Sequence, residues 1–310
     1  MINRSKKRKH LFLTKGVHLV VPAKRLPIHH AMYFEIADGR MIFLIPRDRV
    51  TYIGTTDTPY DGNKDDLDVS QEEADYLLRA VNSMLPNINL GITDISSSWA
   101  GLRPLIFEEG KSASEISRKD EIFISDTGLI SIAGGKLTGY RLMARKVVNR
   151  IARDIAREES LKITKCRTLR IPLSGNSMGS HREVRQYTDQ VSASLSSRDI
   201  PEYYASYLVH NYGQQTDIII GKLEKMRGNN PVLKLIKAEL EYCLAEEMVC
   251  KPLDFIERRT GRLYFWIETI ESYYEEILME FKHRFEWSEK QFKTEKSRVL
   301  KAIHNSKNFI

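Results

Sequence analysis

The sequence lacks the long apolar segments that would assign the chain to the interior of a membrane. No uninterrupted apolar run reaches the roughly 18 residues that a membrane-spanning helix requires. The basic first residues are not followed by the apolar core and cleavage site of a secretory signal. We therefore expect a protein that is cytoplasmic or lies on a membrane face.

Cysteine is also scarce, which argues against a disulfide framework or a zinc site. Cys166, Cys243 and Cys250 show no C-x-x-C spacing, and a sparse, odd set suits a reducing compartment. We expect these three side chains to be small buried hydrophobes. The adjacent His29 and His30 would point to opposite faces of a strand, so no metal site is predicted.

The positive charge of the chain is confined to its start. Residues 1–15 contain six of the basic residues and no acid, against a net charge of +7 for all 310 residues. This concentration predicts a solvated basic tail over residues 1–15, and no nucleic-acid partner is expected. Contact of the tail with anionic lipid or nucleic acid remains the alternative.

The first 60 residues after the tail have the pattern of an antiparallel sheet. Residues 17–21 form an apolar run, and residues 31–36 and 41–45 flank Asp38-Gly39, a strong hairpin signal. Residues 50–54 add another strand. Ser70 and Glu73 form a capping box that predicts a helix over residues 71–85, and residues 96–106 and 114–124 are predicted to be extended.

A strand, a glycine turn and a helix follow in direct succession. Residues 129–133 predict a short buried strand that ends at Gly134-Gly135, and a helix follows. Its apolar residues recur at helical spacing, at Ala144, Val147, Val148, Ile151 and Ile155. Such a unit can direct backbone N–H groups toward an anion.

The remainder of the chain is predicted to be almost wholly helical. Apolar periodicity indicates helices at residues 200–212, 218–226, 232–247, 253–270 and 286–305. The fold class is therefore α+β, with a mixed domain over residues 16–160 and a helical domain over 175–310. We expect the aromatic residues of the helical part to be core, and Arg258, Arg259 and Arg262 to form ion pairs or an interdomain contact.

Five segments together resemble bacterial FAD-dependent glycerol-3-phosphate dehydrogenases. They are KGVHLVVP (15–22), GTTDTPY (54–60), SSWAGLRPLI (97–106), SEISRKDEIF (114–123) and SIAGGKLTGYR (131–141). A sixth, EEMVCKPLDFIERRTGRL (246–263), is similar to the C-terminal domain of that family. The resemblance covers nearly everything after about residue 12.

The resemblance implies both a fold and a reaction. The fold is an antiparallel substrate-binding sheet plus the last strand and helix of an FAD-binding domain, followed by an all-α domain. The reaction is oxidation of sn-glycerol 3-phosphate to dihydroxyacetone phosphate, with hydride transfer to FAD and electrons passed to the membrane quinone pool. This implies an enzyme peripheral to the inner face of the cell membrane. The rivals are a glycerophosphate oxidase that uses O2 and a non-catalytic truncated remnant.

One expected element is missing from these 310 residues. The family begins with a strand, a glycine-rich dinucleotide fingerprint and a helix that hold the ADP half of FAD, and no G-x-G-x-x-G occurs in this sequence. We therefore expect that these residues alone do not hold FAD. A separately encoded FAD-binding half is one partner that would complete the site.

The resemblance also assigns residues to the site. Arg103 and Arg118 match active-site arginines that would bind the phosphate, and His18 would accept the hydroxyl proton, with Arg103 or a water relay as the rival acceptor. Lys136 would lie at the flavin pyrimidine edge and contact substrate. Gly134, Gly135, Leu137 and Thr138 would bring backbone close to FAD. Thr56 and Asp57, in the matched GTTD segment, would orient the pocket or cap a turn.

Overall fold

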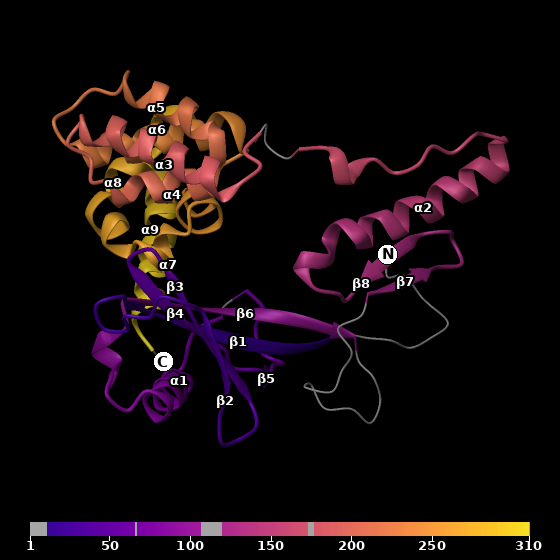
Figure 1. Cartoon of the computed structure of the whole chain (residues 1–310), viewed down its shortest axis with the longest axis horizontal. Coiled ribbons are helices and arrows are strands. Elements are labelled where there is room, and N and C mark those ends of the chain that lie inside the picture. The colour runs from indigo at the N-terminus through magenta and orange to yellow at the C-terminus, as the bar shows by residue number, and fades with distance from the viewer. Residues whose placement is uncertain (1–10, 66, 107–119, 173–176, 310) are drawn as a thin grey trace. The chain divides into compact units, whose positions relative to one another are not determined.

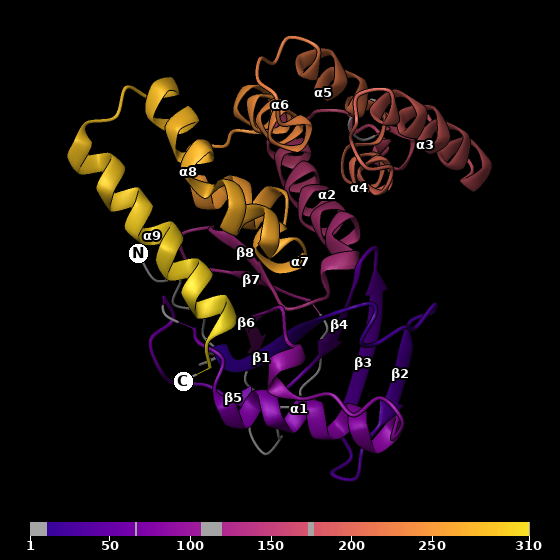
Figure 2. The same cartoon turned by 90° about the vertical axis from the view of Figure 1, so that its left-hand side faces the viewer.

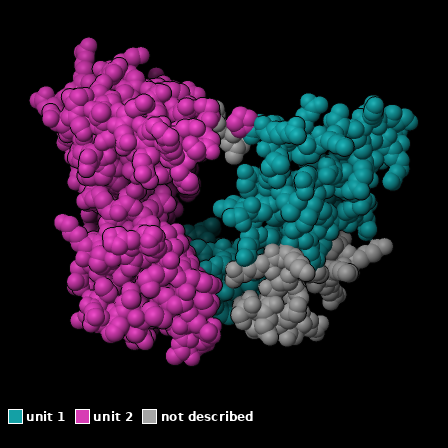
Figure 3. All heavy atoms as spheres, in the orientation of Figure 1, with its two compact units in different colours: residues 1–16, 57–66, 101–171 teal, residues 17–56, 67–100, 172–310 magenta. Residues whose placement is uncertain are grey.

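The structure is a computed structural model that describes residues 11–65, 67–106, 120–172 and 177–309. Its strands and helices form the mixed α+β fold that the sequence predicts (Figure 1). The chain divides into two compact units, coloured teal and magenta in Figure 3. The first holds Met1–Gly16, Asp57–Asp66 and Gly101–Ile171, and the second holds Val17–Thr56, Leu67–Ala100 and Pro172–Ile310. The predicted domain boundaries stay a prediction.

An antiparallel sheet with the strand order β2-β3-β4-β1 forms one part of the second unit. The strands are β1 (Leu11–Pro22), β2 (Met32–Glu35), β3 (Met41–Arg47) and β4 (Val50–Gly54). Gly39, at φ +79°, lies in the turn between β2 and β3, so the predicted hairpin is confirmed. β6 (Ser97–Ile106) also pairs with β1, which confirms the predicted extended stretch.

Strand β1 begins earlier than residue 17, the predicted start of the apolar run. Its first half, in the first unit, pairs with β5 (Thr58–Pro59), with Thr14 opposite Pro59 and Lys15 opposite Thr58. The ladder therefore extends the strand to Leu11, within the segment expected to be a solvated tail; residues 1–10 lie outside the described residues.

One face of the sheet in the second unit packs against a helix. Leu19, Ile53 and Leu44 stand opposite one another on three neighbouring strands and are fully buried. They belong to a core cluster that includes apolar residues of helix α1 (Gln71–Met84), so α1 covers this face (Figure 2). Ser70 and Glu73 form both hydrogen bonds of the predicted capping box, which begins the helix at Gln71.

The first unit contains the predicted strand, glycine turn and helix. β7 (Glu121–Ile124) and β8 (Ile130–Ala133) form an antiparallel pair, followed by a 3₁₀ turn (Leu137–Gly139) and α2 (Tyr140–Glu159). The prediction that residues 129–133 form a buried strand is wrong, because β8 is only half-buried and Leu129 is 52% exposed. The β7–β8 pair and helix α2 form too small a layer to bury both faces of β8.

The helical part of the second unit surrounds one large core cluster that includes Tyr204, Tyr207, Phe255 and Phe281. The predicted core role of these tyrosines is confirmed. Its helices are α3 (His181–Ser196), α4 (Tyr203–Tyr212), α5 (Thr216–Leu223), α6 (Pro231–Glu246), α7 (Arg262–Phe265), α8 (Ile267–Arg284) and α9 (Glu289–Lys307).

The prediction of one continuous helix over residues 253–270 is wrong. The segment consists of a π-helical turn (Asp254–Arg259), then α7, then the start of α8. Gly261 interrupts it at φ +62°, in the left-handed region that ends helices, and Trp266 between α7 and α8 has non-helical φ and ψ. Apolar periodicity continued across these breaks because all the pieces face the same core.

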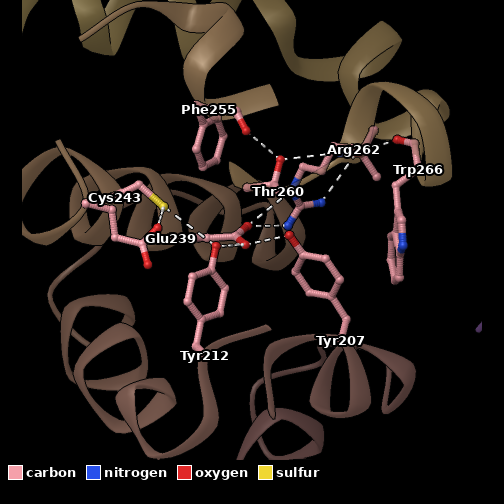
Figure 4. A network of polar contacts seen from close by, with 10 residues as sticks. Tyr207, Tyr212, Glu239, Cys243, Phe255, Thr260, Arg262 and Trp266 are labelled. Atoms are coloured by element: carbon pink, nitrogen blue, oxygen red, sulfur yellow. Dashed lines mark hydrogen bonds and ion pairs between the residues drawn. The ribbon is translucent and has the colours of Figure 1, made fainter. Parts of the chain in front are cut away.

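A buried ion pair lies at the centre of the helical part (Figure 4). Arg262 and Glu239 are both fully buried, and Arg262 Nε donates to Glu239 Oε2 at 3.1 Å. Tyr207 and Tyr212 donate to the other carboxylate oxygen at 2.6 and 2.7 Å. Burial alone would lower the pKa of Arg262, but the Glu239 carboxylate outweighs it and the pKa is raised. The hydrogen bonds within the cluster take the place of water around the buried guanidinium.

The other predicted ion pairs of this segment are also present. Arg258 contacts Asp254 at 3.0 Å and Arg259 contacts Glu247 at 3.8 Å, both at partly exposed positions. The prediction that all three cysteines are buried is wrong, because only Cys243 is buried while Cys166 and Cys250 are exposed. Periodicity gives no guidance for Cys166, since it lies in an irregular segment after α2.

Candidate functional site

The sheet face opposite α1 carries the predicted proton acceptor. His18 on β1 and Phe43 on β3 both stand opposite Gly54 on β4, so the three residues form one row across the sheet. A Cβ on Gly54 would lie 2.6 Å from His18 Cδ2 and 2.5 Å from Phe43 Cζ. The glycine therefore leaves the space that the two rings occupy, and the ring centroids lie 5.7 Å apart.

An indole ring covers the imidazole of His18. The Trp99 ring, from β6, lies 4.7 Å from the His18 ring with an angle of 11° between their planes, which is a stacked arrangement. Thr56, beyond the end of β4, is buried, and its Oγ1 accepts a hydrogen bond of 2.9 Å from the backbone N–H of Val17. The GTTD segment thus fixes the backbone beside His18.

Arg103 is held by an acidic partner in the first unit. Its Nη1 lies 3.0 Å from Asp57 Oδ1, and both side chains are only about a quarter exposed. A guanidinium has five N–H donors in a planar fork, so it can contact a carboxylate and a second anion together. Asp57 therefore orients the predicted phosphate-binding arginine, a role that the sequence left open.

The glycine turn of the first unit is followed by exposed side chains, including that of Lys136. Gly134 and Gly135 have φ values of +77° and +78°, and the side chains of Lys136, Leu137 and Thr138 are exposed. Among the residues that the structure describes, no side chain caps the start of α2 at Gly139. A glycine backbone without side chains, a lysine ammonium and a helix start suit a flat anionic ring edge, so these residues fit the pyrimidine end of a flavin.

The predicted site residues fall into three described groups. His18 lies with Trp99, Phe43 and Gly54 in the second unit, whereas Arg103 with Asp57, and the turn at 134–138, belong to the first. Arg118 lies outside the described residues. Contacts order the His18 and Arg103 groups, and the grouping of all three into one site stays a prediction.

Sequence reasoning missed the roles of Trp99 and Gly54. Both are within the quoted motifs, SSWAGLRPLI and GTTDTPY, so their positions were visible. The row formed by His18, Gly54 and Phe43 depends on strand register, which pairs residues far apart in sequence. A glycine ending a β-branched strand was the available signal for close ring packing.

Comparison with known families divides the chain into two matched parts. Residues 1–141 match the family described as FAD dependent oxidoreductase, and residues 166–292 match the C-terminal domain of alpha-glycerophosphate oxidase. The fold and these matches make the chain similar to FAD-dependent oxidoreductases that carry this helical C-terminal domain. More specifically, the chain is a homologue of the aerobic glycerol-3-phosphate dehydrogenases, which confirms the resemblance seen in its motifs.

The relatives are longer than this chain. An aerobic glycerol-3-phosphate dehydrogenase of Bacillus subtilis is 42% identical over 98% of this chain and 55% of its own length. One of Staphylococcus saprophyticus is 43% identical over 88% of this chain and 50% of its own length. The chain thus spans about half the length of the curated relatives it matches.

A solved structure has the same fold over nearly the whole chain. The glycerol-3-phosphate dehydrogenase from Bacillus halodurans, complexed with FAD, superposes with a TM-score of 0.83 at 37% identity. It covers 98% of this chain, which covers 59% of it. The antiparallel sheet followed by a helical region is therefore the arrangement of a glycerol-3-phosphate dehydrogenase.

Proposed function

We propose that this chain supplies the substrate side of an FAD-dependent oxidation of sn-glycerol 3-phosphate to dihydroxyacetone phosphate. The observation that carries the proposal is the match of 98% of the chain to glycerol-3-phosphate dehydrogenases, in sequence and in fold. The ordered contacts of His18 and Arg103, which lie in the shared motifs, support it. The activity and the substrate are those named for the relatives.

The reaction requires an anion site, a proton acceptor and a hydride acceptor. Arg103 and Arg118 would bind the phosphate, because fixed cations neutralise its nearly double negative charge, and Lys136 would contact the substrate from the flavin edge. His18 would take the proton from the C2 hydroxyl as the C2–H bond gives up its hydride, which leaves a ketone at C2. Bound FAD would supply the hydride acceptor. The turn at 134–138 would hold its pyrimidine edge.

The first unit exposes an apolar surface that a further FAD-binding segment would cover. Helix α2 has no buried residue, and Val148, Ile151 and Ile155 are 59%, 38% and 42% exposed. These residues lie on the predicted stripe at helical spacing. The relatives contain a further part that these 310 residues do not match, and we propose that an equivalent segment, encoded separately or together with this chain, packs here.

The electron acceptor distinguishes two versions of this function. One matched domain is named for an oxidase and the relatives are named dehydrogenases. An oxidase would use O2, whereas the dehydrogenase that the motifs resemble would use the membrane quinone pool at the inner membrane face. Among the described helices, none is long and apolar enough to cross a bilayer.

The proposal is tested by supplying the chain with FAD and the N-terminal segment of the Bacillus subtilis relative and measuring dihydroxyacetone phosphate. Formation of this product from sn-glycerol 3-phosphate supports the proposal, and its absence with folded, flavin-loaded protein contradicts it. Quinone reduction without hydrogen peroxide identifies the dehydrogenase, and stoichiometric peroxide identifies the oxidase.

A further inference from the structure

The aromatic side chains around His18 extend from the sheet to the helical part of the same unit. The Trp99 ring, which stacks on His18, also lies 4.9 Å from the ring of Tyr264 and 5.6 Å from that of Phe265. Tyr264 and Phe265 both belong to α7. Tyr52 of β4 lies 5.9 Å from Trp99 and 5.8 Å from Phe265, so the cluster is continuous.

Polar contacts fix α7 against the sheet beside Trp99. Ser97 Oγ, two residues before Trp99, donates a hydrogen bond to the backbone carbonyl of Tyr264. The Arg47 guanidinium of β3 lies 4.1 Å from the centre of the Phe265 ring, in cation–π contact. The Tyr264 hydroxyl donates to Glu257 at 2.9 Å. These contacts leave little freedom for either ring of α7.

The start of α7 is anchored in turn by the buried ion pair. Arg262, its first residue, is fully buried and bonded to Glu239 of α6. A chain of direct contacts therefore connects the core of the helical part, through α7 and Trp99, to His18. The imidazole therefore has the Trp99 indole stacked on one face and Gly54 close to its Cδ2 atom.

We propose that Trp99, clamped by Tyr264 and Phe265 of α7, is a positioning residue that fixes the ring orientation of His18. The consequence for catalysis rests on the proposed function: a proton acceptor must be aligned with the substrate hydroxyl, and a displacement of about 1 Å can cost on the order of 100-fold in rate. The helical part thereby contributes to the site through α7 without placing a residue on the substrate.

The orientation is testable in the 310-residue chain without flavin or substrate. An indole face shifts the NMR signals of ring protons above it upfield, so the His18 signals, assigned with His18→Gln in histidine-labelled protein, are expected upfield of the other histidines. Trp99→Leu should abolish this shift, whereas Trp99→Phe should retain part of it. Trp287→Phe, which alters a buried indole stacked on Phe281, is the matched control and should leave the shift unchanged.

The clamp is tested by a second pair of variants. Tyr264→Phe keeps the ring against Trp99 and should keep the His18 shift, whereas Tyr264→Ala should reduce or broaden it. Gly54→Ala should also change it, because its Cβ would collide with the imidazole. Folding of every variant is checked by thermal unfolding, and a variant that does not fold is replaced by the milder Tyr264→Leu or Trp99→Met.

The outcomes separate this inference from the proposed function. A His18 shift that is unchanged in folded Trp99→Leu overturns the positioning role. In the flavin-loaded protein, Trp99→Leu should lower kcat by on the order of 100-fold with little change in KM, and Trp99→Phe should restore most of it. An unchanged kcat, once the shift is lost, also overturns the role. Absence of glycerol 3-phosphate oxidation in the unaltered protein overturns the proposed function alone, and the NMR result still decides the orientation.

Discussion

Arg103 Nη1 and Asp57 Oδ1 lie 3.0 Å apart and join strand β6 to the segment after β4 within the first unit. The pair is partly buried, so it fixes a guanidinium at a surface that still admits solvent or a ligand. The planar guanidinium of Arg103 can donate hydrogen bonds to the Asp57 carboxylate and to a second anion at the same time.

Replacement of Arg103 by alanine should weaken transition-state binding of glycerol 3-phosphate. Loss of a charge-assisted phosphate contact costs about 2 kcal/mol, or roughly 30-fold in kcat/KM. Arg150→Ala, which removes an exposed guanidinium paired with Asp154 on α2, serves as the control and should leave kcat/KM unchanged. An unaltered specificity constant in Arg103→Ala would reject the assignment.

Loss of one partner of the buried ion pair should strongly destabilise the helical part. Arg262→Met leaves the buried Glu239 carboxyl group without its cationic partner, with an expected loss of about 3–5 kcal/mol in the free energy of unfolding. Arg258→Met removes a partly exposed pair with Asp254 and should cost less than about 1 kcal/mol. Urea unfolding measures the free energy of unfolding of both variants. Equal losses would contradict the greater stabilisation that we assign to the Arg262–Glu239 pair.

Cys166 and Cys243 should differ in their reactivity with pH. A hydrogen bond with Thr168 lowers the pKa of the exposed Cys166 thiol, whereas burial raises that of Cys243. Since the thiolate is the reactive form, Cys166 should still react with iodoacetamide at a pH where an ordinary exposed thiol has slowed, and Cys243 should react only after unfolding. Peptide mass spectrometry across pH follows each site. Faster labelling of Cys243 than Cys166 in folded protein would contradict this order.

Polar substitution of the exposed apolar stripe on α2 should impair assembly and leave folding intact. Val148→Ser with Ile151→Ser is expected to weaken binding of the N-terminal segment of a relative at least tenfold, since each substitution removes apolar area from the contact. Ile218→Ser, at a 42% exposed position on α5, is the control. Calorimetric titration gives the affinities, and equal binding by the two proteins would exclude this surface.

Local signals in the sequence predicted much of the fold. The Asp38-Gly39 pair specified the hairpin, and Ser70 with Glu73 specified the start of α1, because turns and caps depend on neighbouring residues. The same capping signal at Ser180 and Glu183 begins α3, which the sequence analysis did not assign.

What could not be predicted depends on tertiary packing. The break at Gly261 was hidden because the residues on both sides face one core, and periodicity measures the face and not the continuity of a helix. The stacking of Trp99 on His18 requires β6 to lie beside β1, which no local pattern specifies. The resemblance named His18 and Arg103, while their partners Trp99 and Asp57 came from the fold.

The most direct test of the proposed function is anaerobic reduction of flavin by substrate. The chain is mixed with FAD, with and without the N-terminal segment of the Bacillus subtilis relative, and the visible flavin absorbance is followed after addition of sn-glycerol 3-phosphate or its sn-1 enantiomer. We predict flavin binding and bleaching by sn-glycerol 3-phosphate only when the segment is present, and no bleaching by the enantiomer. Bound flavin that sn-glycerol 3-phosphate does not reduce would contradict the proposed reaction, and stoichiometric flavin on the 310 residues alone would contradict the need for a second segment.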